Sequence, residues 1–116
     1  MKRTVLTALL LAGCVGIDTH KAPPADWPRV MVVEHRVSTL EMLGRCYQYV
    51  PLALKLLGGV PLACMEINLN KLTCDIWLTS WSSQDTVEHE RLHCAGHDHY
   101  EDDTLEQIYR AWKGTL

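Results

Sequence analysis

The chain has 116 residues, of which 47% are hydrophobic and 22% charged, with a formal net charge of −3 at neutral pH. This length and composition suit one compact domain and exclude two domains with separate cores. The excess of acidic over basic residues argues against a nucleic-acid partner.

The N-terminus has the pattern of a cleaved export signal. Two basic residues precede an apolar run at residues 4–12, which is too short to span a bilayer. The run ends in LAGC at residues 11–14, which resembles the lipobox of bacterial lipoproteins. The resemblance implies a signal peptide at residues 1–13, a lipid on Cys14, and a place in the cell envelope, at the outer membrane facing the periplasm. An ordinary signal peptide beside a cysteine is the alternative.

A polar, proline-bearing segment follows, and we expect residues 14–28 to form a tether between the lipid and a domain at residues 29–116. Its His20, like His35 further on, is an isolated histidine to which we assign no role. Assigning Cys14 to the lipid leaves four cysteines, an even number that suits two disulfides in an oxidising compartment: Cys46, Cys64, Cys74 and Cys94.

The first half of the domain should alternate short strands and helices. Residues 29–37 are rich in valine and predict a strand. Ser38 and Glu41 have the spacing of a capping box, so a helix should follow to about Tyr47. A second short helix is expected at residues 52–57, before two glycines.

Residues 62–78 predict a β-hairpin, because two extended runs flank the turn-prone residues 68–71. A hairpin centred on Leu69 would place Cys64 opposite Cys74, within reach of a disulfide. Cys46 would then pair with Cys94. Four cysteines allow three pairings, however, and the sequence does not choose among them.

Two more helices complete the chain. Ser82 or Ser83 should cap a helix at residues 84–95, which Gly96 would end in a left-handed conformation. Thr104 and Gln107 form another capping box, which predicts a helix at residues 104–113. Its buried face should comprise Leu105, Ile108, Tyr109 and Trp112.

The candidate metal-binding and catalytic residues lie within residues 89–99, which have the pattern HExxHxxGxxH. His89 and His93 are four apart on a helix and differ by about 40° in direction, so both imidazoles can reach one ion. Glu90 lies beside the first of them, where it can take a proton from water. A reversal at Gly96 would bring a third ligand to the ion and leave a fourth position for water.

His99 is the expected third ligand, with Asp98 and His97 as rivals. Asp98 could instead accept a hydrogen bond from a ligand histidine. Cys94 is about 100° around the helix from His93, so a disulfide or a core position is expected for it rather than metal ligation.

This segment resembles the active-site signature of the metzincin branch of zinc peptidases. The resemblance implies that His89, His93 and His99 bind Zn²⁺ and that Glu90 is the general base of peptide-bond hydrolysis. The methionine turn of that branch has no counterpart after His99, because the last methionine is Met65. In zincins a strand beside the active helix binds substrate, a place that the hairpin would take. Trp77 and Trp81 would line that groove or belong to the core.

The fold that these patterns predict is α+β, with a small mixed or antiparallel sheet packed on the motif helix and the C-terminal helix. The expected function is that of a zinc metallopeptidase-like lipoprotein acting on a peptide or protein substrate. The alternative is a non-enzymatic envelope or phage-associated lipoprotein in which zinc holds a loop in place. Four protein ligands would favour a structural zinc site, and three ligands with a water would favour catalysis.

Overall fold

The computed structural model of the chain describes residues 20–100 and 102–116. The expected signal peptide, the lipid on Cys14 and the first part of the expected tether lie outside these residues. Within them, no helix combines the length and the apolar character that crossing a bilayer requires.

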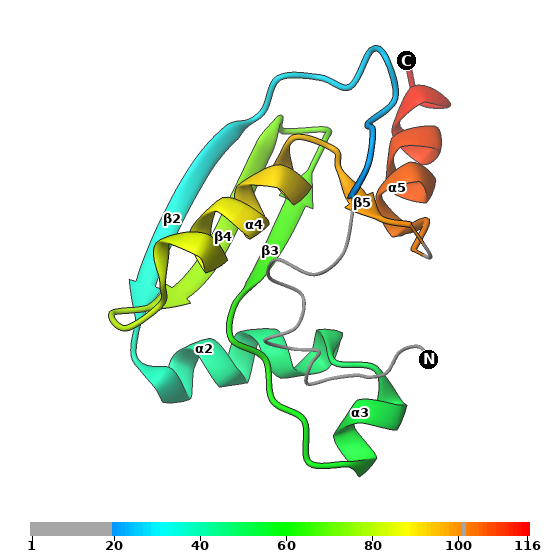
Figure 1. The fold of residues 1–116 in the computed structure, drawn as a ribbon. Helices are drawn as coiled ribbons and strands as arrows, with labels where there is room; N and C mark the ends of the chain where they lie inside the picture. The colour runs from blue at the N-terminus through cyan, green and yellow to red at the C-terminus, as the bar shows by residue number, and fades with distance from the viewer. Residues whose placement is uncertain (1–19, 101) are drawn as a thin grey trace.

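The fold is α+β, as the sequence predicted, with a three-stranded mixed sheet and a C-terminal helix (Figure 1). In chain order, the elements are β1 (His20–Lys21), β2 (Met31–Val37), α2 (Thr39–Cys46), η1 (Tyr47–Tyr49), α3 (Leu52–Leu56), β3 (Cys64–Asn68), β4 (Thr73–Thr79), α4 (Gln84–Cys94), β5 (Asp98–His99) and α5 (Thr104–Lys113).

The main sheet has the strand order β2-β4-β3, with β2 parallel and β3 antiparallel to the central strand. Helices α2 and α3 connect the end of β2 to the start of β3 at the same end of the sheet, and the tight connection after β3 makes a hairpin, so β4 runs parallel to β2. Helix α4 lies across one face of this sheet, and α2 crosses one end of it (Figure 1). A separate pair of short strands, β1 and β5, is antiparallel.

Two small cores lie on opposite faces of the sheet, because side chains alternate along β4. Ile76 and Leu78 are fully buried and pack with Val87 of α4. Trp77 points to the other face, where it packs with Met42 of α2. The central strand β4 therefore contributes side chains to both cores.

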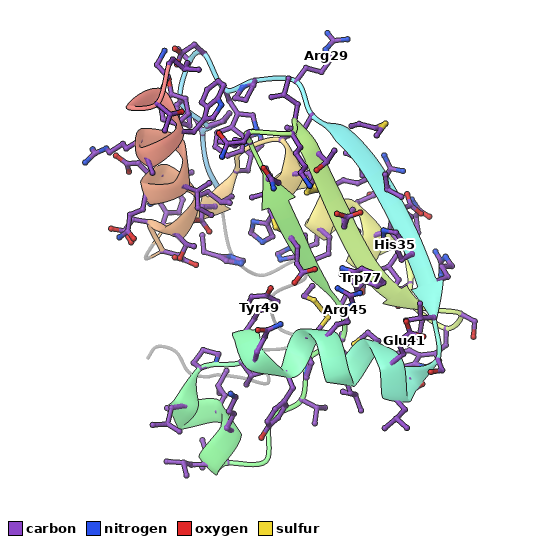
Figure 2. All side chains as sticks on the ribbon, turned by 180° about the vertical axis from the view of Figure 1, so that it is seen from behind. Arg29, His35, Glu41, Arg45, Tyr49 and Trp77 are labelled. Carbon is purple, nitrogen blue, oxygen red and sulfur yellow. A yellow bond between two sulfur atoms is a disulfide. The ribbon has the colours of Figure 1, made fainter. Side chains whose placement is uncertain are left out.

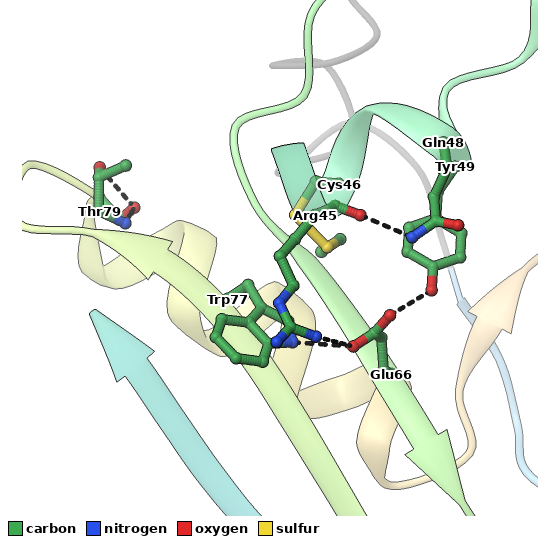
Figure 3. Close-up of a disulfide and its surroundings, with 9 residues drawn as sticks. Arg45, Cys46, Gln48, Tyr49, Glu66, Trp77 and Thr79 are labelled. Carbon is green, nitrogen blue, oxygen red and sulfur yellow. Dashed lines mark hydrogen bonds and ion pairs between the residues drawn. A yellow bond between two sulfur atoms is a disulfide. The ribbon is translucent and has the colours of Figure 1, made fainter. Parts of the chain in front are cut away.

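Trp77 belongs to this second core, with only 8% of its surface exposed. Its ring stacks on His35, with 4.1 Å between the ring centroids, and the Arg45 guanidinium lies 3.9 Å from the Trp77 centroid. The indole N–H donates to Glu66 at 3.0 Å, and the Tyr49 hydroxyl donates to the same carboxylate. Figures 2 and 3 show these side chains on the face of the sheet opposite α4.

The caps of α2 and α4 agree with the sequence. The Ser38 hydroxyl accepts from the amide of Glu41 at 3.1 Å, and the Ser83 hydroxyl accepts from the amide of Thr86 at 3.2 Å. The short helix α3 ends before Gly58, whose φ of +80° few other residues adopt.

The capping box expected at Thr104 and Gln107 is wrong, although α5 has the expected bounds. Asp103 occupies the N-cap position without a side-chain cap, and Thr104 is the first helical residue. Carboxylates from outside the helix accept from the first amides: Asp102 from Thr104 at 2.9 Å and Asp98 from Leu105 at 3.2 Å. Of the expected buried face of α5, Leu105 is buried, and the other members are partly buried: Ile108, Tyr109 and Trp112.

The expected register of the hairpin is also wrong. The last pair is Asn68 with Thr73, so the loop comprises residues 69–72 and is not centred on Leu69. Leu72 takes a positive φ of 56°, and the Asn68 side chain accepts from the amide of Lys71 at 3.1 Å. Cys64 consequently faces Trp77 rather than Cys74.

Both disulfides that followed from that register are therefore wrong, while the expectation of two disulfides is confirmed. Cys46 is bonded to Cys64, with 5.5 Å between the Cα atoms, and Cys74 to Cys94, with 5.8 Å. Each bond ties the last residue of a helix to the sheet beneath it, Cys46 of α2 to β3 and Cys94 of α4 to β4 (Figure 3 shows the first).

Candidate metal centre

Helix α4 presents two histidines from the same side of its last turns. His89 and His93 are separated by four residues, and their Nε2 atoms lie 3.1 Å apart. His89 is buried, with 5% of its surface exposed, and His93 is partly buried. One imidazole nitrogen from each of these two histidines is therefore available to the same metal ion.

The chain reverses directly after α4. The amide of Gly96 donates to the carbonyl oxygen of His93 at 2.9 Å, and the amide of His97 donates to that of Leu92 at 3.0 Å. Together with the φ of +96° at Gly96, these bonds form a Schellman motif. Only glycine adopts such a φ without strain, so Gly96 sets the path that leads from the second histidine to β5.

This reversal brings His99 back to the other two histidines. Its ring centroid is 5.2 Å from that of His89 and 4.8 Å from that of His93. Each of the three offers one nitrogen, and these atoms all lie within 4.8 Å of one another. Among the described residues, His89, His93 and His99 are the group that could hold a metal ion.

The two rivals for the third position have other contacts. The Asp98 carboxylate accepts from the amides of His99 and Leu105, at 2.9 and 3.2 Å, so it binds the start of α5. Burial raises the pKa of Asp98. His97 contributes its backbone: its carbonyl oxygen accepts from His93 Nδ1 at 2.7 Å.

This hydrogen bond also fixes the tautomer of His93. A carbonyl oxygen can only accept, so Nδ1 carries the proton and the lone pair of a neutral ring lies on Nε2. That nitrogen is the one that faces His89. Bonding of the outer ring nitrogen to a carbonyl is the usual way in which proteins orient a metal-bound histidine.

The group fits a divalent metal that prefers nitrogen donors. Nitrogens bound to one tetrahedral ion at 2.0–2.1 Å lie about 3.3 Å from each other, close to the 3.1 Å between His89 and His93. Metal ligation needs neutral imidazoles, and burial lowers the pKa of His99, which favours its neutral form. Such a site suits Zn²⁺ and other metals that bind imidazole.

Glu90 follows the first histidine on α4 and is partly buried. Burial raises its pKa to about 7. A carboxyl group with such a pKa can both accept and release a proton near neutral pH.

Cys94, expected to lie off the metal face, is in a disulfide with Cys74. Contact between the expected tether and this site was not predicted from the sequence. Strand β1 pairs with β5, and the indole N–H of Trp27 donates to the carbonyl oxygen of Cys94 at 3.1 Å. The signal for this contact is weak: a tryptophan flanked by prolines in a polar segment.

Comparisons of the chain with protein-family models, with curated proteins and with solved structures find no match.

Proposed function

We propose that the chain is a zinc-dependent hydrolase that cleaves peptide bonds, with His89, His93 and His99 as metal ligands and Glu90 as general base. The observation that carries the proposal is the convergence of three imidazoles beside a carboxyl group on the same helix. Three side-chain donors leave one position of a four-coordinate ion for water, which is the arrangement of a catalytic site.

Glu90 would move the protons of the reaction. Zinc in such a site supplies a Lewis acid that lowers the pKa of water to about 7 and polarises a carbonyl group. The Glu90 carboxylate would accept a proton from the attacking water and pass it to the leaving amine. A pKa of about 7 suits both transfers, because such a group can accept a proton and release it again near neutral pH.

Strand β3 is the proposed place for the substrate backbone. It is the terminal strand of the described sheet, hydrogen-bonded on one side to β4, and it contacts α4. An extended peptide can add to such an edge by main-chain hydrogen bonds. Trp77 would not line that groove, because it packs against α2 on the other face of the sheet.

We further propose that the chain is a lipoprotein of the cell envelope, anchored through Cys14 and facing the periplasm. His20 is the sixth residue after Cys14, and a fully extended chain of six residues spans at most about 20 Å. Since His20 pairs with His99, the proposed metal site would lie close to the membrane surface. Cys14→Ser should abolish labelling by a fatty acid and release the chain from membranes; a labelled variant would contradict the anchor.

A structural zinc site is the other candidate. It would need a fourth protein ligand, and Asp98 is the nearest choice by sequence. The contacts of its carboxylate with the amides of His99 and Leu105 favour a role in capping α5 instead. The catalytic proposal therefore fits the described residues better.

The test is to measure metal content and peptide cleavage for the wild type and for Glu90→Gln. This variant should keep its metal and lose at least about 100-fold in cleavage rate, the usual contribution of a general base. Glu88→Gln is the matched control, because Glu88 is exposed on the same helix. Equal cleavage by wild type and Glu90→Gln would remove Glu90 from the mechanism, and wild type without stoichiometric metal would end the proposal.

A further inference from the structure

The third histidine is held in place by the N-terminal end of the described chain. His99 and Asp98 of β5 pair with His20 and Lys21 of β1, antiparallel. From β1 the chain passes α5 and runs along the edge of the molecule to the start of β2 (Figure 1). A strand of two residues has no stability of its own, so β5 depends on what it pairs with and packs against.

Trp27 supports the reversal that separates His93 from His99. Its indole N–H donates to the carbonyl oxygen of Cys94, the last residue of α4, at 3.1 Å. A Cβ atom added at Gly96 would lie only 2.6 Å from Cδ2 of Trp27 and 2.7 Å from Cβ of Pro23. The indole ring and the proline therefore pack directly on the backbone of the turn.

The same segment is fixed on its other side to α5. Trp27 stacks on Tyr109 with 6.0 Å between the ring centroids. Asp26 forms an ion pair with Lys113 at 2.7 Å and accepts from the Tyr109 hydroxyl. Asp98 joins β5 to the first turn of α5, so β5, α5 and residues 20–28 support one another.

We propose that residues 20–28 form a clasp that positions His99 for the metal, with Trp27 as the positioning residue. The clasp rests on the metal site of the proposed function, and it makes the N-terminal segment part of the metal centre. When the clasp is released, the ion is held by His89 and His93 of α4 alone. Metal loading is then coupled to docking of the segment that follows the expected lipid anchor.

The experiment compares Co²⁺ and Zn²⁺ binding by the full chain and three variants: Trp27→Ala, Trp27→Phe and Trp81→Ala. Trp81 is the matched control, since its indole N–H also bonds, to Thr39 at 3.0 Å, but it precedes the opposite end of α4. The readouts are the dissociation constant, the Co²⁺ visible spectrum, which reports the coordination number, and thermal unfolding without metal.

Trp27→Ala should weaken binding about 10- to 100-fold, the range for groups that orient a ligand, and should give a Co²⁺ spectrum of a site with fewer protein ligands. Trp27→Phe keeps the packing on Gly96 and should recover part of the affinity. Trp81→Ala should bind as the wild type does, even where its unfolding temperature falls.

Two results would overturn the clasp: Trp27→Ala with the affinity and spectrum of the wild type, or an equal loss of affinity in Trp27→Ala and Trp81→Ala. Failure of the proposed function looks different. A wild type that binds no metal removes both proposals, whereas a wild type that binds metal without cleaving peptides leaves the clasp standing.

Discussion

His93 donates its Nδ1–H to the backbone carbonyl oxygen of His97, 2.7 Å away, across the turn that Gly96 makes. The turn therefore does two things at once: it orients the second histidine and it leads the chain to the third. Since the acceptor is a main-chain atom, the side chain at position 97 is not needed for this orientation.

Because His97 acts through its backbone, mutation can distinguish His97 from His99 as the third metal ligand. We expect His99→Ala to weaken Zn²⁺ binding more than about 100-fold, beyond the usual effect of an orienting hydrogen bond, and His97→Ala to change it little. Isothermal titration with Zn²⁺ on both variants measures the difference. A loss in His97→Ala as large as that in His99→Ala would show that the imidazole of His97 binds the metal.

A second prediction concerns the turn itself. Gly58 and Gly96 both have positive φ, but open space surrounds Gly58 whereas Trp27 and Pro23 crowd Gly96. Gly58→Ala should cost roughly 1–2 kcal/mol of unfolding free energy from backbone strain alone. Gly96→Ala should cost about 1–3 kcal/mol more, from overpacking. Urea unfolding of both variants checks this, and equal losses would mean that the contact with Trp27 contributes nothing.

The two disulfides should be distinguishable by their effect on the metal. They close loops with sequence separations of 18 and 20 residues, and each should contribute about 3 kcal/mol to stability. Replacing Cys46 and Cys64 by serine should lower stability without weakening metal binding. Replacing Cys74 and Cys94 should also weaken metal binding, because Cys94 directly follows His93 and anchors the end of α4 to β4.

Peptide mapping of the oxidised chain gives an independent check of this connectivity. Digestion should yield one linked pair containing Cys46 and Cys64 and another containing Cys74 and Cys94. A linked pair of Cys64 with Cys74 would restore the symmetric hairpin that the structure contradicts.

The local signals in the sequence were sufficient for most elements and for the histidine group. Ser38 and Ser83 mark the starts of α2 and α4, and Gly96 marks the turn, because caps and left-handed residues act over a few residues. The spacing of His89, His93 and His99 works in the same way, since all three lie within one helix turn and its reversal.

The features that were not predicted from the sequence depend on contacts between segments that are far apart in the chain. A four-residue loop instead of a symmetric turn moved Cys64 away from Cys74, and the cysteine pairing changed with it. The contact between Trp27 and Cys94 joins residues 67 apart, and no local pattern in the polar N-terminal segment encodes it. Asp98 likewise replaced the expected Thr104 cap from outside the helix.

On the face of the sheet opposite α4, the Tyr49 hydroxyl should titrate at an unusually high pH (Figure 3). The hydrogen bond from the Tyr49 hydroxyl to the Glu66 carboxylate, with burial, raises the pKa of Tyr49 to about 12, and Arg45 opposes this. The folded chain keeps this proton more tightly than the unfolded chain, whose tyrosine titrates near 10. The stabilisation is therefore complete below about pH 10 and is lost as the pH rises toward 12.

Glu66→Gln should return the pKa of Tyr49 toward 10, which a titration followed by tyrosinate absorbance would detect as a lost high-pH phase. Glu41→Gln is the control, because Glu41 is exposed on α2 and has no contact with Tyr49 among the described hydrogen bonds. Tyr49→Phe should remove the same phase from the wild-type curve and so assign it. A high-pH phase that persists in Tyr49→Phe would belong to another tyrosine and contradict the assignment.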